Sequence, residues 1–163
     1  MKRQIGILCL VVAVGIISEA ALAPPDLSGT WIRDKFKSDP TMKAIRVSKS
    51  GEQVAELEFS MVIDQEGNNL RVATRVDDNI VLEVLYKLDG TETSASVDQG
   101  EIISSAKWHG DKLIIDKTSK FGEREEKSKE QWSLSPDGKV LTITAIRYVP
   151  QGAQTTKQTY NRK

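Results

Sequence analysis

The side chains best suited to catalysis or metal binding are scarce in this sequence. It contains one histidine, His109, in the turn-like stretch Trp108-His109-Gly110-Asp111, and one cysteine, Cys9. A Ser-His-Asp arrangement needs a histidine packed beside a serine and an acid, and zinc or copper sites need several His or Cys ligands. We therefore predict no catalytic residue, no metal site and no cofactor, with His109 exposed to water in a turn.

Arg147 is the charged residue whose position calls most clearly for a partner. It continues the alternation of Leu141, Ile143 and Ala145, which places it on the apolar face of a strand. An unpaired buried charge is costly. Arg147 therefore either pairs with an acidic side chain, lies at an open rim, or binds an anionic ligand. The same three possibilities apply to Arg33, which shares the face of Trp31 on the first strand.

Arg147 and Tyr160 are the predicted anchors for the polar head of such a ligand. A guanidinium binds a carboxylate through two parallel hydrogen bonds, and a tyrosine hydroxyl adds one more. Each hydrogen bond to a charged group contributes roughly 1.5–3 kcal/mol. On this reasoning Arg147→Ala would weaken an anionic ligand by on the order of ten- to a hundredfold. The other predicted ligand-binding residues are Tyr86, Trp108, Leu141 and Ile143.

A succession of β-strands would carry these residues. Apolar and polar side chains alternate with a period of two, and short turns such as Asp89-Gly90 and Ser135-Pro136-Asp137-Gly138 separate the runs. The predicted strands cover residues 30–34, 59–64, 70–76, 80–88, 101–108, 112–117, 124–134, 140–149 and 155–162.

The short turns predict how the strands are arranged. Sequential hairpins give an antiparallel meander, since parallel strands would need crossover segments that are missing after Glu58. A long meander leaves two exposed edges unless it closes. We therefore predict an all-β fold, an up-and-down antiparallel β-barrel of about 8–10 strands. In it, strand 30–34 meets strand 155–162. A β-sandwich is the alternative.

Two segments depart from the strand pattern. In Thr41–Glu58, apolar residues have helical spacing, and its second half consists of good helix formers, so we predict a short helix between the first two strands. The charge-rich run Glu123–Glu130 predicts a solvated hairpin.

The N-terminus is organised like a secretory signal peptide. Lys2-Arg3 precedes an apolar run, Ile5–Ile17, and Ala21-Leu22-Ala23 offers small residues where a signal peptidase reads. The run is shorter than the ~20 residues of a membrane span. We expect a cleaved signal peptide over residues 1–23, one domain over 24–163, and an extracytoplasmic location, periplasmic or secreted. N-terminal sequencing of the exported protein should begin at Pro24, and a retained signal sequence would contradict cleavage.

The charge balance excludes one class of partner. Lys and Arg together number 23, as do Asp and Glu. The chain therefore has no net field to attract nucleic acid or an acidic membrane. We expect no nucleic-acid binding and no stable membrane insertion after signal cleavage.

Six short motifs follow one another along the mature chain. They are Gly29-Thr30-Trp31, Lys37-Ser38-Asp39, Gly67-Asn68-Asn69-Leu70, Tyr86-Lys87-Leu88-Asp89-Gly90, the stretch 106–113 and the stretch 132–139. In this order they resemble a bacterial secreted lipocalin-like family of the calycin superfamily, which is similar to lipocalins and fatty-acid-binding proteins.

The resemblance implies a fold and a function. It implies a non-catalytic barrel that binds a small hydrophobic or amphipathic ligand, lipid or fatty-acid-like. It implies a helical lid at residues 41–58 and a basic residue, Arg162, packed across Trp31. Fatty-acid-binding proteins read a carboxylate with an Arg-x-Tyr pair in the last strand. This chain has Gln158 and Tyr160 there, so the arginine is missing.

The contents of the barrel interior separate two possible functions. If the interior is hollow, its predicted wall consists of Leu70, Val72, Val84, Tyr86, Ile102, Ala106, Leu141 and Ile143. In the alternative, the interior is filled by side chains and the barrel is a structural or interaction protein without a ligand. The filling side chains would be Trp31, Met61, Tyr86, Trp108 and Trp132. A cavity of a few hundred Å³ would favour ligand binding.

Overall fold

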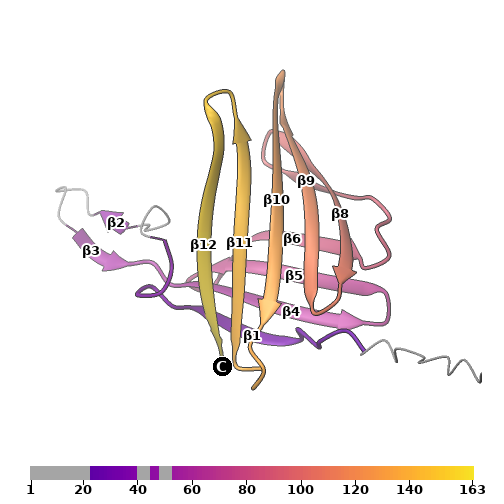
Figure 1. The fold of residues 1–163 in the computed structure, drawn as a ribbon. Coiled ribbons are helices and arrows are strands. Elements are labelled where there is room, and N and C mark those ends of the chain that lie inside the picture. Colours follow the sequence, from indigo (N-terminus) through magenta and orange to yellow (C-terminus); the bar gives the residue numbers. More distant parts are fainter. Residues whose placement is uncertain (1–22, 40–44, 48–52) are drawn as a thin grey trace, which may run out of the picture.

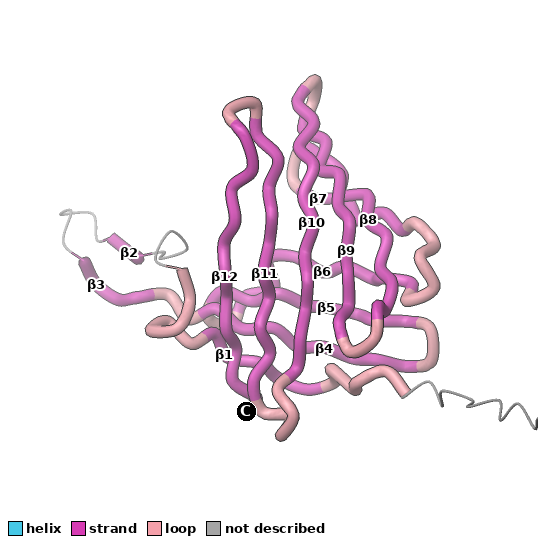
Figure 2. The backbone as a smooth tube through the Cα atoms, in the orientation of Figure 1, coloured by secondary structure: helices cyan, strands magenta, loops and turns pink. Residues whose placement is uncertain are grey.

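The computed structural model describes residues 23–39, 45–47 and 53–163, which form an all-β architecture (Figures 1 and 2). The strands are β1 (Gly29–Arg33), β2 (Ile45–Val47), β3 (Gln53–Glu56), β4 (Phe59–Glu66), β5 (Asn69–Val76), β6 (Asn79–Lys87), β7 (Thr93–Val97), β8 (Gly100–His109), β9 (Lys112–Phe121), β10 (Arg124–Leu134), β11 (Val140–Val149) and β12 (Gly152–Arg162).

Ten of these strands form one antiparallel sheet. Their order is β6-β5-β4-β1-β12-β11-β10-β9-β8-β7. The sheet curls into a nearly closed barrel, so that the two end strands, β6 and β7, come into contact with each other. The predicted up-and-down barrel is confirmed. None of the described residues belongs to a helix long and apolar enough to cross a membrane.

Tight turns hold consecutive strands in register, as the β10–β11 turn illustrates. Pro136 and Asp137 occupy its centre, and the Gly138 N–H donates to the Ser135 carbonyl over 2.8 Å. Gly138 has a φ of 70°, which only glycine adopts freely. The Asp137 carboxylate accepts hydrogen bonds from the Ser135 hydroxyl and the Lys139 N–H. The predicted hairpin is therefore built from the residues that identified it in the sequence.

The first strand meets the last, as predicted, and this pairing joins the two halves of the sheet. Trp31 lies opposite Arg162 on β12 and opposite Met61 on β4. The Trp31 side chain is fully buried, and its Nε1 donates to the Leu27 carbonyl over 2.8 Å. The Arg162 guanidinium lies 4.3 Å from the centre of the Trp31 ring, which confirms the packing that the resemblance implied. Arg162 also donates to the carbonyl of Gly138 over 2.8 Å.

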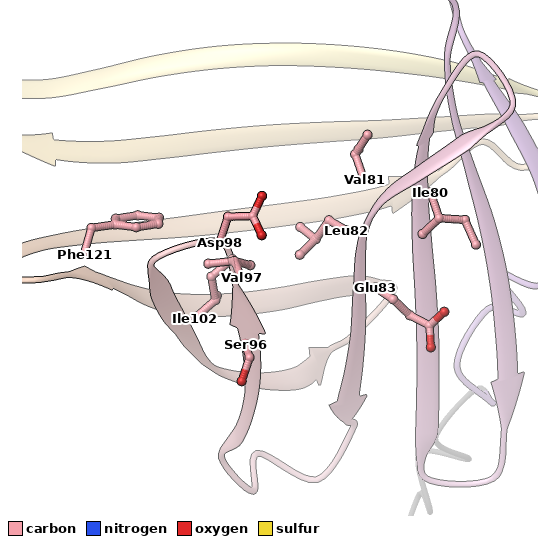
Figure 3. A pocket seen from close by; sticks show the side chains of 9 residues that line it. All are labelled: Ile80, Val81, Leu82, Glu83, Ser96, Val97, Asp98, Ile102 and Phe121. Carbon is pink, nitrogen blue, oxygen red and sulfur yellow. The ribbon is translucent and has the colours of Figure 1, made fainter.

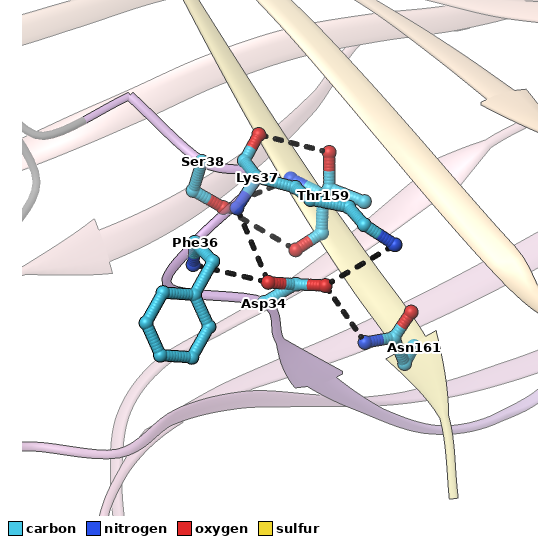
Figure 4. Close-up of polar contacts among 6 residues, drawn as sticks. All are labelled: Asp34, Phe36, Lys37, Ser38, Thr159 and Asn161. Atoms are coloured by element: carbon cyan, nitrogen blue, oxygen red, sulfur yellow. Dashed lines mark hydrogen bonds and ion pairs between the residues drawn. The ribbon is translucent and has the colours of Figure 1, made fainter.

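The segment after β1 extends the contact with β12 (Figure 4). The Ser38 hydroxyl donates to the Thr159 carbonyl and accepts from the Thr159 N–H over 3.1 Å. Asp34 accepts hydrogen bonds from Asn161 and from the N–H groups of Phe36 and Lys37. Desolvation alone would raise the pKa of Asp34, but these hydrogen bonds hold it below its usual value. Residues 34–38 thus connect the end of β1 to the last strand, β12, through hydrogen bonds.

The short helix predicted within Thr41–Glu58 is not confirmed. Apart from Leu57 and Glu58, the described residues of that segment belong to β2 and β3, which pair with each other as a separate two-stranded sheet. Residues 40–44 and 48–52 lie outside the described residues, as do residues 1–22 of the predicted signal peptide. Helix propensity is a weak preference that pairing with a neighbouring strand overrides.

The hydrophobic core occupies the end of the barrel near Trp31. The side chains that are fully buried there come from strands on all sides of the barrel, and include Leu70, Leu113, Ile115 and Leu141. Seven of the eight predicted wall residues belong to this core, and the eighth, Ile102, is half-buried. The alternation in the sequence therefore identified the inner face correctly.

Candidate ligand-binding site

The barrel is filled at one end and open at the other. The inner face of β9 shows the change. Leu113 and Ile115 are fully buried, the Lys117 side chain keeps 17% of its surface exposed, and Phe121 at the strand end is 41% exposed. We call the end with Leu113 the closed end and the end with Phe121 the open end. Exposure of the inner face of β9 therefore increases toward the open end.

A pocket of about 710 Å³ lies at the open end, where β6 approaches β7 and β8 (Figure 3). It lies at the gap in the barrel, where β6 and β7, the two end strands of the sheet, face each other without pairing. Its lining residues are Ile80, Val81, Leu82, Glu83, Ser96, Val97, Asp98, Ile102 and Phe121. In Figure 3 the side chain of Leu82 on β6 extends toward Val97 on β7. The volume is within the range of small-molecule sites.

The outer part of this pocket combines exposed apolar side chains with the acidic residues Glu83 and Asp98. Ile80 and Val81 expose more than half of their surface, 55% and 57%, and Phe121 lies on the opposite side of the same pocket. Apolar side chains exposed around a concave site are typical of places where a ligand or partner binds. The half-buried Leu82 and Ile102 continue this apolar lining inward.

Below the pocket, an ion pair lies on the inner face. The Lys117 ammonium on β9 is 2.7 Å from Oε1 of Glu130 on β10, and each side chain is only 17% exposed. The Trp132 Nε1 donates to the other carboxylate oxygen, Oε2, over 2.8 Å. The Lys117 ammonium also lies 5.7 Å from the centre of the Tyr86 ring on β6. We call these four side chains, Lys117, Glu130, Trp132 and Tyr86, the cluster. It connects β9 and β10 with the end strand β6.

Electrostatics keeps the lysine of this cluster charged. Burial disfavours its ammonium, but the nearby Glu130 carboxylate outweighs burial and raises the pKa of Lys117 above its usual value. Burial also raises the pKa of Tyr86, so its hydroxyl stays protonated at neutral pH. A charged lysine is a hydrogen-bond donor, not a nucleophile.

The strand register places this cluster next to the pocket. Ile102 lines the pocket, and Ser104, two residues further along β8, lies directly opposite Lys117. Two residues of a strand span about 7 Å. On β6 the inward sequence runs from Leu82 in the pocket to Tyr86 beside the ammonium. The pocket and the ion pair therefore lie next to each other on the inner face of the barrel, and the ion pair is nearer the closed end.

The predicted ligand-binding residues lie at different levels of the barrel. All six occupy the inner face. Tyr86, Leu141, Ile143 and Tyr160 are buried, Trp108 is half-buried, and Arg147 is exposed. Nε1 of Trp108 is buried, yet no described atom accepts its hydrogen bond.

Tyr160 lies in the closed end with a partner of its own. Its hydroxyl donates to Gln158 Oε1 over 2.7 Å. Burial raises the pKa of Tyr160 to about 12, so the hydroxyl is neutral under ordinary conditions. The two positions that match the Arg-x-Tyr pair of fatty-acid-binding proteins therefore bond to each other.

Arg147 and Tyr160 are too far apart to bind one carboxylate. Tyr160 pairs with Leu141 on β11, and Arg147 lies six residues further toward the open end of the same strand. Six residues span about 20 Å. Because exposed ion pairs contribute only about 0.2–1 kcal/mol, we expect Arg147→Ala to weaken an anionic ligand by less than tenfold, a smaller effect than the sequence suggested.

Sequence reasoning missed the two charged residues of the cluster. Glu130 was included in a run predicted to be solvated, and this is wrong for Glu130, whose carboxylate is inside the barrel. The prediction holds for Glu123, Arg124 and Glu125, which are exposed at the hairpin tip. The available signal was alternation, because Lys117 shares the face of Leu113 and Ile115, and Glu130 shares the face of Trp132.

His109 is exposed at the end of β8, as predicted. Within the described ranges, no group of three His, Cys, Asp or Glu residues is placed to hold a metal ion.

Comparisons with known proteins agree on the fold. No family model matches the sequence, and no curated protein matches it. Among solved structures, the REP1-NXSQ fatty acid transporter is 17% identical, with a TM-score of 0.58 over 85% of this chain and 96% of that one. Zebrafish ileal bile acid-binding protein in complex with cholic acid is 17% identical, with a TM-score of 0.54 over 83% and 98%. Human cRBP IV is 21% identical, with a TM-score of 0.54 over 86% and 100%.

At these identities the likeness concerns the fold alone. The neighbours include a fatty acid transporter and a bile acid-binding protein, and they do not support the narrower resemblance to a bacterial secreted family. The chain shares the barrel fold of these neighbours.

Proposed function

We propose that this chain is a non-catalytic binding protein that holds a small hydrophobic or amphipathic, lipid-like molecule inside its barrel. The observation that carries the proposal is the pocket of about 710 Å³ between β6 and β7, whose lining residue Ile102 is two residues along β8 from the position opposite Lys117. The neighbours of similar fold include a fatty acid transporter and a bile acid-binding protein, which supports the same class of ligand.

A barrel filled by its own side chains describes the closed end but not the open end. Trp31 and Trp132 do fill the closed end, as that alternative requires. At the open end, however, the inner-face residues Leu82 and Ile102 line a pocket. We further propose that residues 1–23 direct export and are removed, which places the binding domain outside the cytoplasm.

Displacement of an environment-sensitive fluorescent fatty acid from residues 24–163 tests the binding function. Wild type should bind the probe saturably and release it to unlabelled lipid. Leu82→Trp fills the pocket and should weaken binding roughly tenfold or more, because the ligand loses contact area. The matched control, Val62→Trp, places the same side chain on the outer face of β4 and should leave affinity unchanged. Absence of saturable binding by wild type would contradict the proposal.

A further inference from the structure

The Lys117–Glu130 ion pair is an unexpected component of a barrel wall. Around it on the inner face lie Ile115, Trp132 and Tyr86, which are all buried. A buried ion pair is weak evidence for stability, because well-packed apolar residues in its place are often neutral or stabilising. Charged groups in a concave site are instead frequent where a ligand is recognised. The pair therefore requires an explanation in terms of what the barrel binds.

The hydrogen bonds within the cluster leave a donor free but few acceptors. Both oxygens of the Glu130 carboxylate are engaged, one by the Lys117 ammonium and the other by Trp132 Nε1. An ammonium has three N–H donors. The one on Lys117 uses one of them on Glu130 and directs another at the Tyr86 hydroxyl, which leaves one. Ser104 and Ser128 lie opposite Lys117 on the two neighbouring strands. The cluster thus offers an N–H donor to an oxygen atom that enters from the pocket.

The same cluster is electrically neutral as a unit. A ligand carboxylate at Lys117 would bring a second negative charge next to Glu130, and this repulsion is strong in a poorly hydrated interior. A hydroxyl or carbonyl oxygen accepts the same hydrogen bond without adding charge. Arg147 lies across Ser128 from Lys117 on the same inner face, but it is exposed, and ion pairs of exposed side chains contribute little.

From this arrangement we infer that the barrel selects an uncharged amphiphile, such as a long-chain alcohol or ester, whose head-group oxygen accepts a hydrogen bond from the Lys117 ammonium. The inference rests on the proposed binding function and specifies its ligand class. The closed end below Lys117 is filled by Leu113 and Ile115, so the head group rests on this floor. The tail then extends past Leu82 and Ile102 into the pocket.

The test compares oleyl alcohol with oleic acid, which differ only in the head group. Their affinities are measured by displacement of a fluorescent probe at neutral pH, and the readout is the acid-to-alcohol ratio of affinities. Glu130→Gln leaves the Lys117 charge uncompensated and should shift this ratio toward the acid by on the order of ten- to a hundredfold. Glu125→Gln is the matched control, since Glu125 is exposed on the other face of β10 and pairs with Lys127, and should not shift the ratio.

A second variant covers the case in which Glu130→Gln does not fold. Lys117→Met combined with Glu130→Leu leaves no charge unpaired and should keep the fold. It removes the donor to the head group, so oleyl alcohol should bind about tenfold more weakly. Unchanged alcohol affinity in this double variant would overturn the inference.

The remaining outcomes distinguish this inference from the proposed function. If wild type prefers oleic acid and Arg147→Ala abolishes that preference, the head group lies at Arg147, and the inference fails while lipid binding stands. An equal ratio in wild type and folded Glu130→Gln overturns the inference in the same way. If wild type binds neither lipid, both the inference and the proposed function are rejected.

Discussion

Deletion of residues 155–163 is expected to abolish cooperative folding. The deletion removes most of β12, which lies between β1 and β11 in the middle of the ten-stranded sheet. The backbone hydrogen bonds of two neighbours are lost, and both become exposed edges that promote aggregation. Fully buried Trp31 also loses its contact with Arg162. We expect aggregation or a broad transition when the truncated chain is unfolded in urea and followed by circular dichroism.

A synthetic peptide of residues 152–163 provides the control for this deletion. Added to the freshly diluted truncated chain, it should restore a cooperative transition, because it supplies the missing strand with its native register. A truncated chain that stays soluble and unfolds cooperatively without the peptide would contradict the barrel closure and favour an open sandwich.

Trp31→Ala should produce the second largest effect. The Trp31 side chain is fully buried at the closed end, stacks against Arg162 and donates a hydrogen bond to Leu27. Replacing a buried tryptophan with alanine costs about 3–5 kcal/mol, which is a large part of the 5–15 kcal/mol that typically stabilises a domain. Urea denaturation of wild type and variant measures the difference in the free energy of unfolding.

Phe36→Ala is the matched control for the loss of an aromatic side chain. Phe36 is only five residues further along the chain, but 88% of its surface is exposed. Surface substitutions of this kind usually change stability by less than about 0.5 kcal/mol. Equal destabilisation by the two substitutions would show that Trp31 does not have the structural role described above.

Much of the barrel could be predicted because the side-chain period of a strand is two and turns have characteristic residues. Alternation placed Leu141 and Ile143 inside, and short hairpins excluded parallel pairing. One strand, β7, was missed because its sequence, Thr93-Ser94-Ala95-Ser96-Val97, consists of small residues with little contrast between faces. The residues of β3 were read as helical because Glu, Gln and Ala favour helices in isolation, while pairing with β2 decided the outcome.

The candidate site was less predictable, since it depends on pairing between strands. Lys117 and Glu130 are thirteen residues apart, and only the register of β9 with β10, which places Ile115 opposite Glu130, makes them diagonal neighbours. Alternation also gave the face of Arg147 correctly. It gave no information on how far each residue lies from the open end. That distance differs between Arg147, which is exposed, and Tyr160, which is buried.

Intermolecular nuclear Overhauser effects between a bound long-chain alcohol and the methyl groups of the protein test the central claim most directly. The claim is that the ligand lies inside the barrel, between the ion pair and the pocket. It predicts contacts from the ligand to the methyl groups of Leu82 and Ile102, with head-group protons close to Tyr86. Contacts confined to Val62 and Ala73, which line a second pocket of about 500 Å³ and do not line the first, would contradict it.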